Sequence, residues 1–103
     1  RSYYMSFIKH AYQEIKAIDP SITTDQFSTN WLNKCSSYYR SYKASDRDMT
    51  LHAIMCLLIN LSNKADVLRR NNNHKLLHAK AEQYLALGQL AQEQLTDKLP
   101  SRS

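Results

Sequence analysis

Glycine and proline are scarce in this chain of 103 residues, which holds one glycine and two prolines. A β-sheet protein needs several tight turns, and those turns depend on these two residue types. Alanine, leucine, glutamine, lysine and glutamate, all good helix formers, are common instead. We therefore expect an all-α fold, a bundle of four to five helices.

Cysteines and long apolar runs are also few. Cys35 and Cys56 are too few and too far apart in the sequence to indicate a disulfide framework. The sequence shows no secretory signal and no unbroken apolar run of the ~18 residues that a membrane span needs. We expect a cytoplasmic protein with reduced thiols and no membrane partner.

The length and the charge narrow the class of protein further. A chain of 103 residues has room for one helical domain, 1–103. Within it we expect a head at 5–68, a C-terminal helix at 69–96 and a flexible tail at 97–103. The net charge of +5 favours a polyanionic partner such as nucleic acid or an acidic membrane surface.

The first half of the chain predicts one longer and two short helices. Apolar residues recur at intervals of three and four between Tyr4 and Ile18, and Pro20 ends the pattern. A second, short helix begins at a cap formed by Thr23 or Thr24. After a turn of about three residues, a third helix follows over the remainder of 24–44.

The second half predicts two long helices. The fourth helix begins at a cap formed by Asp48 or Thr50, and the run 71–73 of three asparagines ends it. Its expected buried face is Leu51, Ile54, Met55, Leu58 and Leu61. The fifth helix ends before Pro100, and its expected apolar positions are Leu77, Ala81, Tyr84, Leu85, Gly88, Ala91 and Leu95.

The two short helices at 24–44 form a pattern of their own, with the residues Phe27-Ser28-x-x-Trp31-Leu32-Asn33-x-x-Ser36-Ser37-Tyr38-Tyr39. This pattern resembles the helix-turn-helix of small bacterial proteins related to the repressor-like class, over roughly residues 5–68. In that class the second short helix lies in the major groove of DNA. The resemblance implies a transcriptional regulator whose partner is double-stranded DNA.

The resemblance also assigns structural positions. It makes Thr29 the small residue at the helix crossing and places Asn33 at the turn position that glycine usually holds. Asparagine adopts the positive φ of such a turn less readily than glycine. Lys34 departs from the pattern, because an apolar residue is usual there; a shift of the register by one would place Cys35 in that position. The buried anchors implied are Leu32, Tyr39 and Tyr42.

The third helix then presents a small polar face. With Tyr39 and Tyr42 directed inward, a rotation of ~100° per residue directs four residues outward. These are Ser37, Arg40, Ser41 and Ala44, with Ser36 and Tyr38 at the margins. We expect base readout by Ser37, Arg40 and Ser41. We expect phosphate contacts from Lys34, Ser36, Tyr38, Lys43 and Arg47.

Other concentrations of polar residues have simpler explanations. Between Lys64 and Lys80, five basic residues outnumber Asp66, which would suit either a further phosphate-contacting edge or a solvated face. The pairs His74 and His78, and His52 and Cys56, have the i, i+4 spacing of metal ligands but no recognisable third ligand nearby. We expect no metal, no cofactor and no catalytic activity.

The surplus of apolar faces on helices four and five has two explanations. An antiparallel helical pair with a leucine and alanine seam is a common homodimer surface, and a two-fold dimer would place two recognition helices about one DNA turn apart. Alternatively, the pair completes an intramolecular bundle. The alternative to DNA binding is a helical protein–protein interaction module that uses its aromatic and leucine faces.

Overall fold

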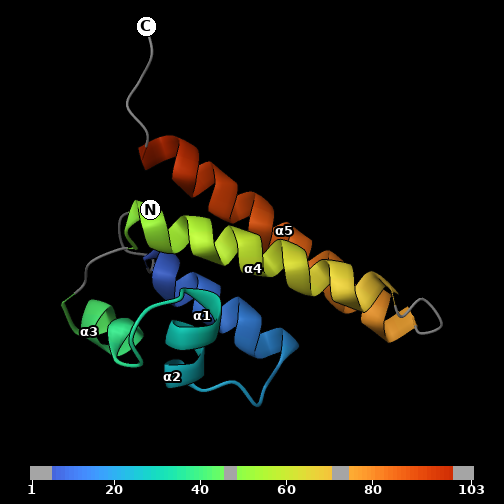
Figure 1. Cartoon of the computed structure of the whole chain (residues 1–103), viewed down its shortest axis with the longest axis horizontal. Coiled ribbons are helices and arrows are strands. Elements are labelled where there is room, and N and C mark those ends of the chain that lie inside the picture. The colour runs from blue at the N-terminus through green and yellow to red at the C-terminus, as the bar shows by residue number, and fades with distance from the viewer. Residues whose placement is uncertain (1–5, 46–48, 71–74, 99–103) are drawn as a thin grey trace, which may run out of the picture.

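A computed structural model describes residues 6–45, 49–70 and 75–98 of the chain (Figure 1). These residues contain helices and no strand, which confirms the all-α prediction. The elements in chain order are α1 (Phe7–Ile18), α2 (Thr24–Gln26), the π-helical turn η1 (Phe27–Trp31), α3 (Tyr38–Ser45), α4 (Leu51–Arg70) and α5 (Lys75–Lys98).

The helices form two layers. The long helices α4 and α5 run side by side as a hairpin, and α1, α2 and α3 lie on one side of it (Figure 1). The predicted C-terminal helical hairpin is therefore present. The run of asparagines that was expected to end the fourth helix lies outside the described residues.

Helix α1 supplies the centre of the core. It is amphipathic, and Ile8, Ala11 and Ile15 are fully buried one turn apart. The backbone nitrogen of Asp19 donates to the Ile15 carbonyl at 2.7 Å, which completes the last turn before Pro20. The predicted stripe of this helix is confirmed, because most of its apolar positions are buried.

The buried face of α4 differs from the predicted one. Ile54 and Leu61 are buried as expected, but Leu51 and Met55 are exposed. The buried residues of α4 are Ala53, Ile54, Leu57, Leu61 and Ala65. Helix α4 packs against α5 on one side and η1 on another. The buried side of α4 is therefore not the predicted side that carries Leu51 and Met55.

Thr50 begins α4. Its side-chain oxygen accepts a hydrogen bond from the backbone nitrogen of Ala53 at 3.3 Å, as an N-cap does. Of the two caps that the sequence allowed, Thr50 is therefore the one observed. Asp48 lies outside the described residues.

Several of the apolar positions predicted for α5 are buried. Ala81, Tyr84 and Ala91 are buried, and Leu87 joins them in the core. The ring of Tyr84 stacks on that of Trp31 with 5.4 Å between centroids, which ties the hairpin to the layer below. The remaining predicted positions, Leu77, Leu85, Gly88 and Leu95, are half-buried.

Helix α4 has the length and apolar composition of a membrane-spanning helix. The core helix of a protein without a membrane meets the same criteria. Here Ile54, Leu57 and Leu61 are buried against the rest of the fold, so packing within the bundle accounts for part of this apolar composition.

Candidate nucleic-acid interface

The first helix of the candidate interface starts with a capping box. Thr23 Oγ1 accepts a hydrogen bond from the Gln26 backbone nitrogen at 3.1 Å, and Gln26 Oε1 accepts one from the Thr23 nitrogen at 3.1 Å. These two bonds satisfy donors that the first turn leaves without helical partners. Helix α2 then widens into η1, where the Leu32 nitrogen donates to the Phe27 carbonyl at 3.3 Å.

Ser28 is the small residue where this helix meets α3. It is fully buried, and its hydroxyl accepts a hydrogen bond from the backbone nitrogen of Tyr39 at 2.9 Å and donates to the Thr24 carbonyl at 3.1 Å. The assignment of Thr29 to this crossing was wrong by one position. Thr29 is exposed, because the π-helical turn directs Ser28 toward α3 instead.

Asn33 provides the turn, as predicted. Its φ is +56°, the left-handed conformation that asparagine adopts more readily than most residues. Asn60 of α4 fixes this turn through its Nδ2, which donates to the Trp31 carbonyl at 2.8 Å and to Asn33 Oδ1 at 3.3 Å. Leu32, a predicted anchor, is fully buried just before the turn.

Aromatic rings anchor α3 to the rest of the head. Tyr39 is buried against Phe27 and Tyr12, with ring centroids 5.5 and 4.8 Å away. Burial raises the pKa of Tyr39. The anchor role predicted for Tyr39 is confirmed, whereas Tyr42, predicted to be buried, is half-buried.

The sequence predicted that Tyr38 lies at the outward margin of α3, but the structure buries this side chain. It is 9% exposed and stacks on Tyr42 with 4.2 Å between ring centroids. Its hydroxyl accepts a hydrogen bond from the Thr50 nitrogen at 3.4 Å, at the start of α4. Because the side chain is buried there, a phosphate contact by Tyr38 is no longer expected.

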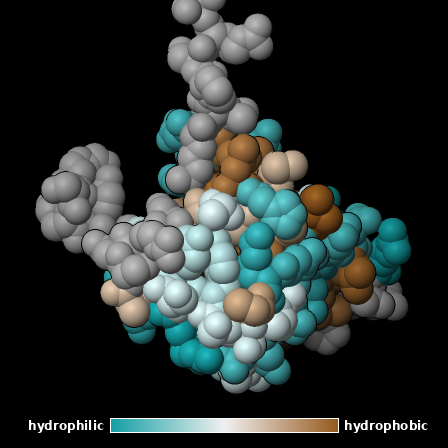
Figure 2. All heavy atoms as spheres, turned by 60° about the vertical axis from the view of Figure 1, so that its left-hand side comes forward, coloured by the Kyte–Doolittle hydropathy of each residue, from teal (hydrophilic) through white to brown (hydrophobic). Residues whose placement is uncertain are grey.

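Five of the predicted contact residues lie on the solvent side of this region. Arg40, Ser41 and Lys43 are exposed on α3, and Ser36 and Ser37 are exposed just before its first turn. The surface view toward α3 shows mostly hydrophilic and intermediate residues there (Figure 2). Arg47 lies outside the described residues. The five exposed residues and Ala44, which is also exposed, are called the α3 face below.

Arg40 is not free on this face. Its guanidinium forms an ion pair with the carboxylate of Asp25, in the first turn of α2. Both side chains are about half exposed, so the pair is screened by water and is readily broken. The two residues are fifteen positions apart in the sequence, so helical spacing gives no indication of this contact.

Lys34 is turned toward α4. Its ammonium donates to His52 Nδ1 at 2.9 Å and lies 5.9 Å from the centre of the Tyr38 ring. Since an ammonium group only donates, the ring proton of His52 belongs on Nε2. The side chain of Lys34 thus reaches a polar partner at the start of α4. This contact explains why the turn does not need the apolar residue that is usual at the position of Lys34.

The two thiols lie in different surroundings. Cys35 is exposed in the turn, and hydrogen bonds from the Ser37 side chain and backbone lower the pKa of its thiol. Cys56 Sγ lies 3.8 Å from His52 Nε2 and 3.9 Å from Nδ1. Among the described residues no three potential ligands gather around a metal position. His74, of the other predicted pair, lies outside them.

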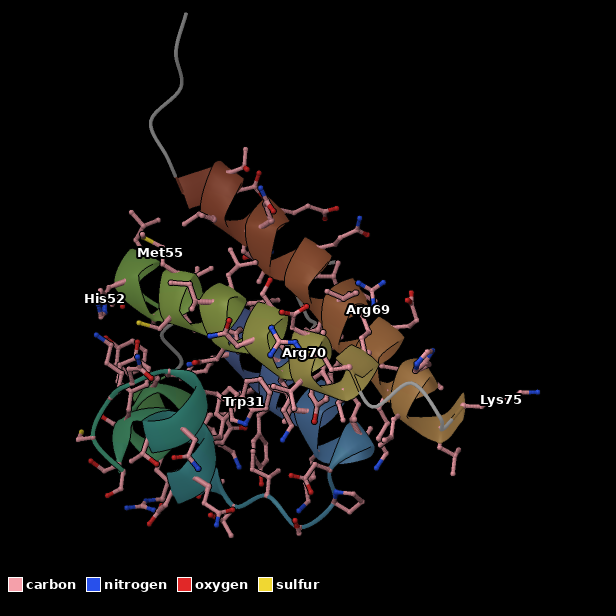
Figure 3. The ribbon with its side chains drawn as sticks, turned by 45° about the vertical axis from the view of Figure 1, so that its right-hand side comes forward. Trp31, His52, Met55, Arg69, Arg70 and Lys75 are labelled. Atoms are coloured by element: carbon pink, nitrogen blue, oxygen red, sulfur yellow. The ribbon has the colours of Figure 1, made fainter. Side chains whose placement is uncertain are left out.

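The second basic concentration lies at the other end of α4 from His52 and Met55 (Figure 3). Two of its arginines already have carboxylate partners: Arg69 pairs with Glu82 at 3.3 Å and Arg70 with Asp66 at 3.2 Å. All four side chains are exposed, as in an ordinary solvated charged surface.

An open polar cleft of about 500 Å³ lies on another side of η1. Trp31 forms part of its wall, and Lys64 contributes the only side chain of fixed positive charge. The other polar lining residues are Asp19, Ser21, Gln26, Asn30, Asn60 and Asn63. These are mainly amide side chains, and Asn60 and Gln26 already serve the turn and the capping box.

Comparisons with known proteins place the chain in one family. No curated protein matches the sequence. No solved structure matches the fold. A family model matches nearly the whole chain, residues 8–102, and this match includes both the α3 face and the helical hairpin. On this match the chain belongs to the family of unknown function DUF6626.

Proposed function

We propose that this protein binds double-stranded DNA through the α3 face, without catalysis, as a transcriptional regulator does. The observation that carries the proposal is the arrangement of α3. Tyr39 packs inward, the turn at Asn33 sets the crossing, and small or basic side chains remain on the outside. A helix that enters the major groove needs an outer face of this kind.

The exposed side chains suit distinct parts of the duplex. The Arg40 guanidinium is able to make two hydrogen bonds to one guanine once it leaves Asp25. The hydroxyls of Ser37 and Ser41 are able to bond bases or phosphates, and Lys43 is placed at the edge for a phosphate. Base readout therefore falls to Ser37, Arg40 and Ser41, whereas Lys43 and Ser36 position the helix.

The test is binding to mixed-sequence duplex DNA over a series of salt concentrations, comparing the wild type with Arg40→Ala and Lys43→Ala. Lys43→Ala removes a proposed phosphate contact and should reduce the slope of log affinity against log salt by about 1. Arg40→Ala removes a proposed base contact and should weaken binding. Lys80→Ala is the control, because Lys80 is an exposed lysine of α5 away from the α3 face. Absence of binding at low salt would contradict the proposal.

The alternative is a protein–protein interaction module. One observation favours it: several large apolar side chains are exposed on the hairpin, among them Met55 and Ile59 of α4. An interaction module would bind its partner through the hairpin and would be unaffected by Arg40→Ala. The DNA proposal has priority because the α3 face is polar and basic, and because it needs only the side chains already exposed there.

A further inference from the structure

One face of the α4–α5 hairpin is unusually apolar for a surface. Leu51, Met55 and Ile59 follow one another at intervals of four along α4, so they lie on one side of that helix. They are 37%, 47% and 59% exposed. Figure 3 shows Met55 directed away from the layer that contains α1 and Trp31. Figure 2 shows hydrophobic atoms gathered toward the hairpin.

A groove between the two helices adjoins this row of side chains. It has a volume of about 180 Å³, and Leu58 of α4 lies on one wall and Leu85 of α5 on the other. Gly88 leaves room in it, because a glycine has no side chain to fill the space between the helices. The rest of the lining is Leu61, Ser62, Tyr84, Gln89 and Gln92. The row and the groove together are called the outer face.

The outer face also lacks charge over its central part. The segment 51–63 of α4 contains no aspartate, glutamate, lysine or arginine, and neither does the segment 83–92 of α5. The groove brings these two segments together. Interface centres are depleted of charged residues in this way, whereas ordinary solvated helix surfaces are rich in them.

We propose that the outer face binds the outer face of a second copy of this chain. A projecting apolar row and an apolar groove on one surface are self-complementary. A two-fold axis can therefore place Ile59 of each copy in the groove of the other. The residues that pack in the leucine and alanine seam, such as Ala81 and Ala91, are buried within one chain and are not available for this contact.

The charges at the two ends of the hairpin fit the same arrangement. Arg70, which pairs with Asp66, and Lys75 lie at the end where α4 meets α5, and Glu93 and Asp97 lie toward the other end of α5, where Lys98 follows them in the sequence. In a two-fold pair of antiparallel hairpins, the basic end of each copy lies beside the acidic end of the other. Such complementarity fixes the relative direction of the two copies more than it adds affinity.

The area available indicates a reversible dimer. A helix of α4's length spans ~30 Å, and two adjacent helices present a face ~20 Å wide, which gives ~600 Å² per copy. The total of ~1,200 Å² is at the lower limit for specific interfaces. The dissociation constant should therefore lie in the micromolar range, and the dimer should form and dissociate with concentration.

The experiment is sedimentation equilibrium of the full chain from roughly 5 to 500 µM, with a thiol reductant so that the exposed Cys35 cannot link two copies. The wild type should pass from monomer to dimer over this range. Ile59→Lys and Gln92→Lys, one on each helix of the outer face, should each raise the dissociation constant at least about tenfold. Both side chains are exposed, so neither change disturbs the monomer fold.

Leu76→Lys is the matched control. Leu76 is 66% exposed near the start of α5, and helical spacing places it on the opposite side of that helix from Leu85. Three results would overturn the proposal: a wild type that stays monomeric, a dimer that persists in Ile59→Lys, or equal weakening by Leu76→Lys. If the wild type stays monomeric, binding to vesicles of phosphatidylcholine and phosphatidylglycerol would identify a membrane as the occupant of the outer face instead.

Discussion

The hydroxyl of Ser28 in η1 accepts a hydrogen bond from the backbone nitrogen of Tyr39, the second residue of α3, at 2.9 Å. Early nitrogens of a helix have no partner within the helix. Ser28 therefore acts as a cap supplied from a different helix, and it fixes where α3 starts relative to η1. This single buried bond joins the two short helices on which the proposed DNA contact depends.

Replacing Ser28 tests the importance of this bond. Ser28→Ala leaves the Tyr39 nitrogen buried without an acceptor, which should lower the free energy of unfolding by about 1–3 kcal/mol. The measurement is urea denaturation followed by circular dichroism. Thr29→Ala removes a neighbouring hydroxyl that is exposed, and it should change stability by less than about 0.5 kcal/mol. Equal effects of the two changes would contradict the cap role.

Asn33 should tolerate only residues that accept a positive φ. Asn33→Ala keeps the left-handed conformation but loses the short polar side chain that lets asparagine adopt it, so we expect a loss of about 1 kcal/mol or more. The same change also removes the contact of Asn33 Oδ1 with Asn60. Asn33→Gly keeps the backbone conformation accessible and should be the milder change in thermal denaturation. Because both variants lose the contact with Asn60, a glycine variant less stable than the alanine variant would contradict the requirement for a positive φ.

Asp25 should oppose DNA binding, if the proposed function holds. Asp25→Asn releases Arg40 from its ion pair and removes a negative charge near the α3 face. Since exposed ion pairs contribute at most about 1 kcal/mol, affinity for duplex DNA should rise by up to about fivefold. The measurement is fluorescence anisotropy at fixed salt. Glu93→Gln, the same charge change on α5, is the control, and unchanged or weaker binding by Asp25→Asn would contradict the prediction.

Tyr84 should make stability fall in strongly alkaline solution. Burial, with a smaller effect from the negative charge of Asp19, raises the pKa of Tyr84 from 10.0 to about 12. The unfolded chain ionises at the lower value while the folded chain keeps the neutral phenol. The contribution of the neutral Tyr84 side chain to the free energy of unfolding is therefore complete below pH 10 and is lost as pH rises toward 12. At about pH 11 the wild type should have lost about 1 kcal/mol from this source.

The comparison for Tyr84 is Tyr84→Phe, which cannot ionise. The difference in free energy of unfolding between the two chains should shift in favour of the variant between about pH 9 and pH 11. Chemical denaturation at each pH gives both values, and the background loss from other groups is common to them. A constant difference across the range would mean that Tyr84 ionises normally in the folded chain.

Much of the head could be predicted from the local sequence. Scarce glycine and proline together with helical periodicity indicated an all-α fold, because both reflect backbone preferences of nearby residues. The resemblance to the helix-turn-helix class placed Asn33 at a left-handed turn. The resemblance to the helix-turn-helix class implied Tyr39 as an anchor. The failure at Thr29 arose in η1, because a π-helical turn shifts the rotation of the side chains relative to a regular helix. The failure at Tyr38 arose because the start of α4, at Thr50, packs against its hydroxyl.

The sequence by itself determined the class of fold, the α1 stripe, the two short helices with their turn and the long hairpin. Only the tertiary structure decided which side of α4 is buried, because both sides carry apolar residues and the choice depends on where α5 and η1 pack. It also decided that Asp25 holds Arg40 and that Lys34 holds His52. Such contacts join positions far apart in the sequence, and periodicity carries no information about distant pairs.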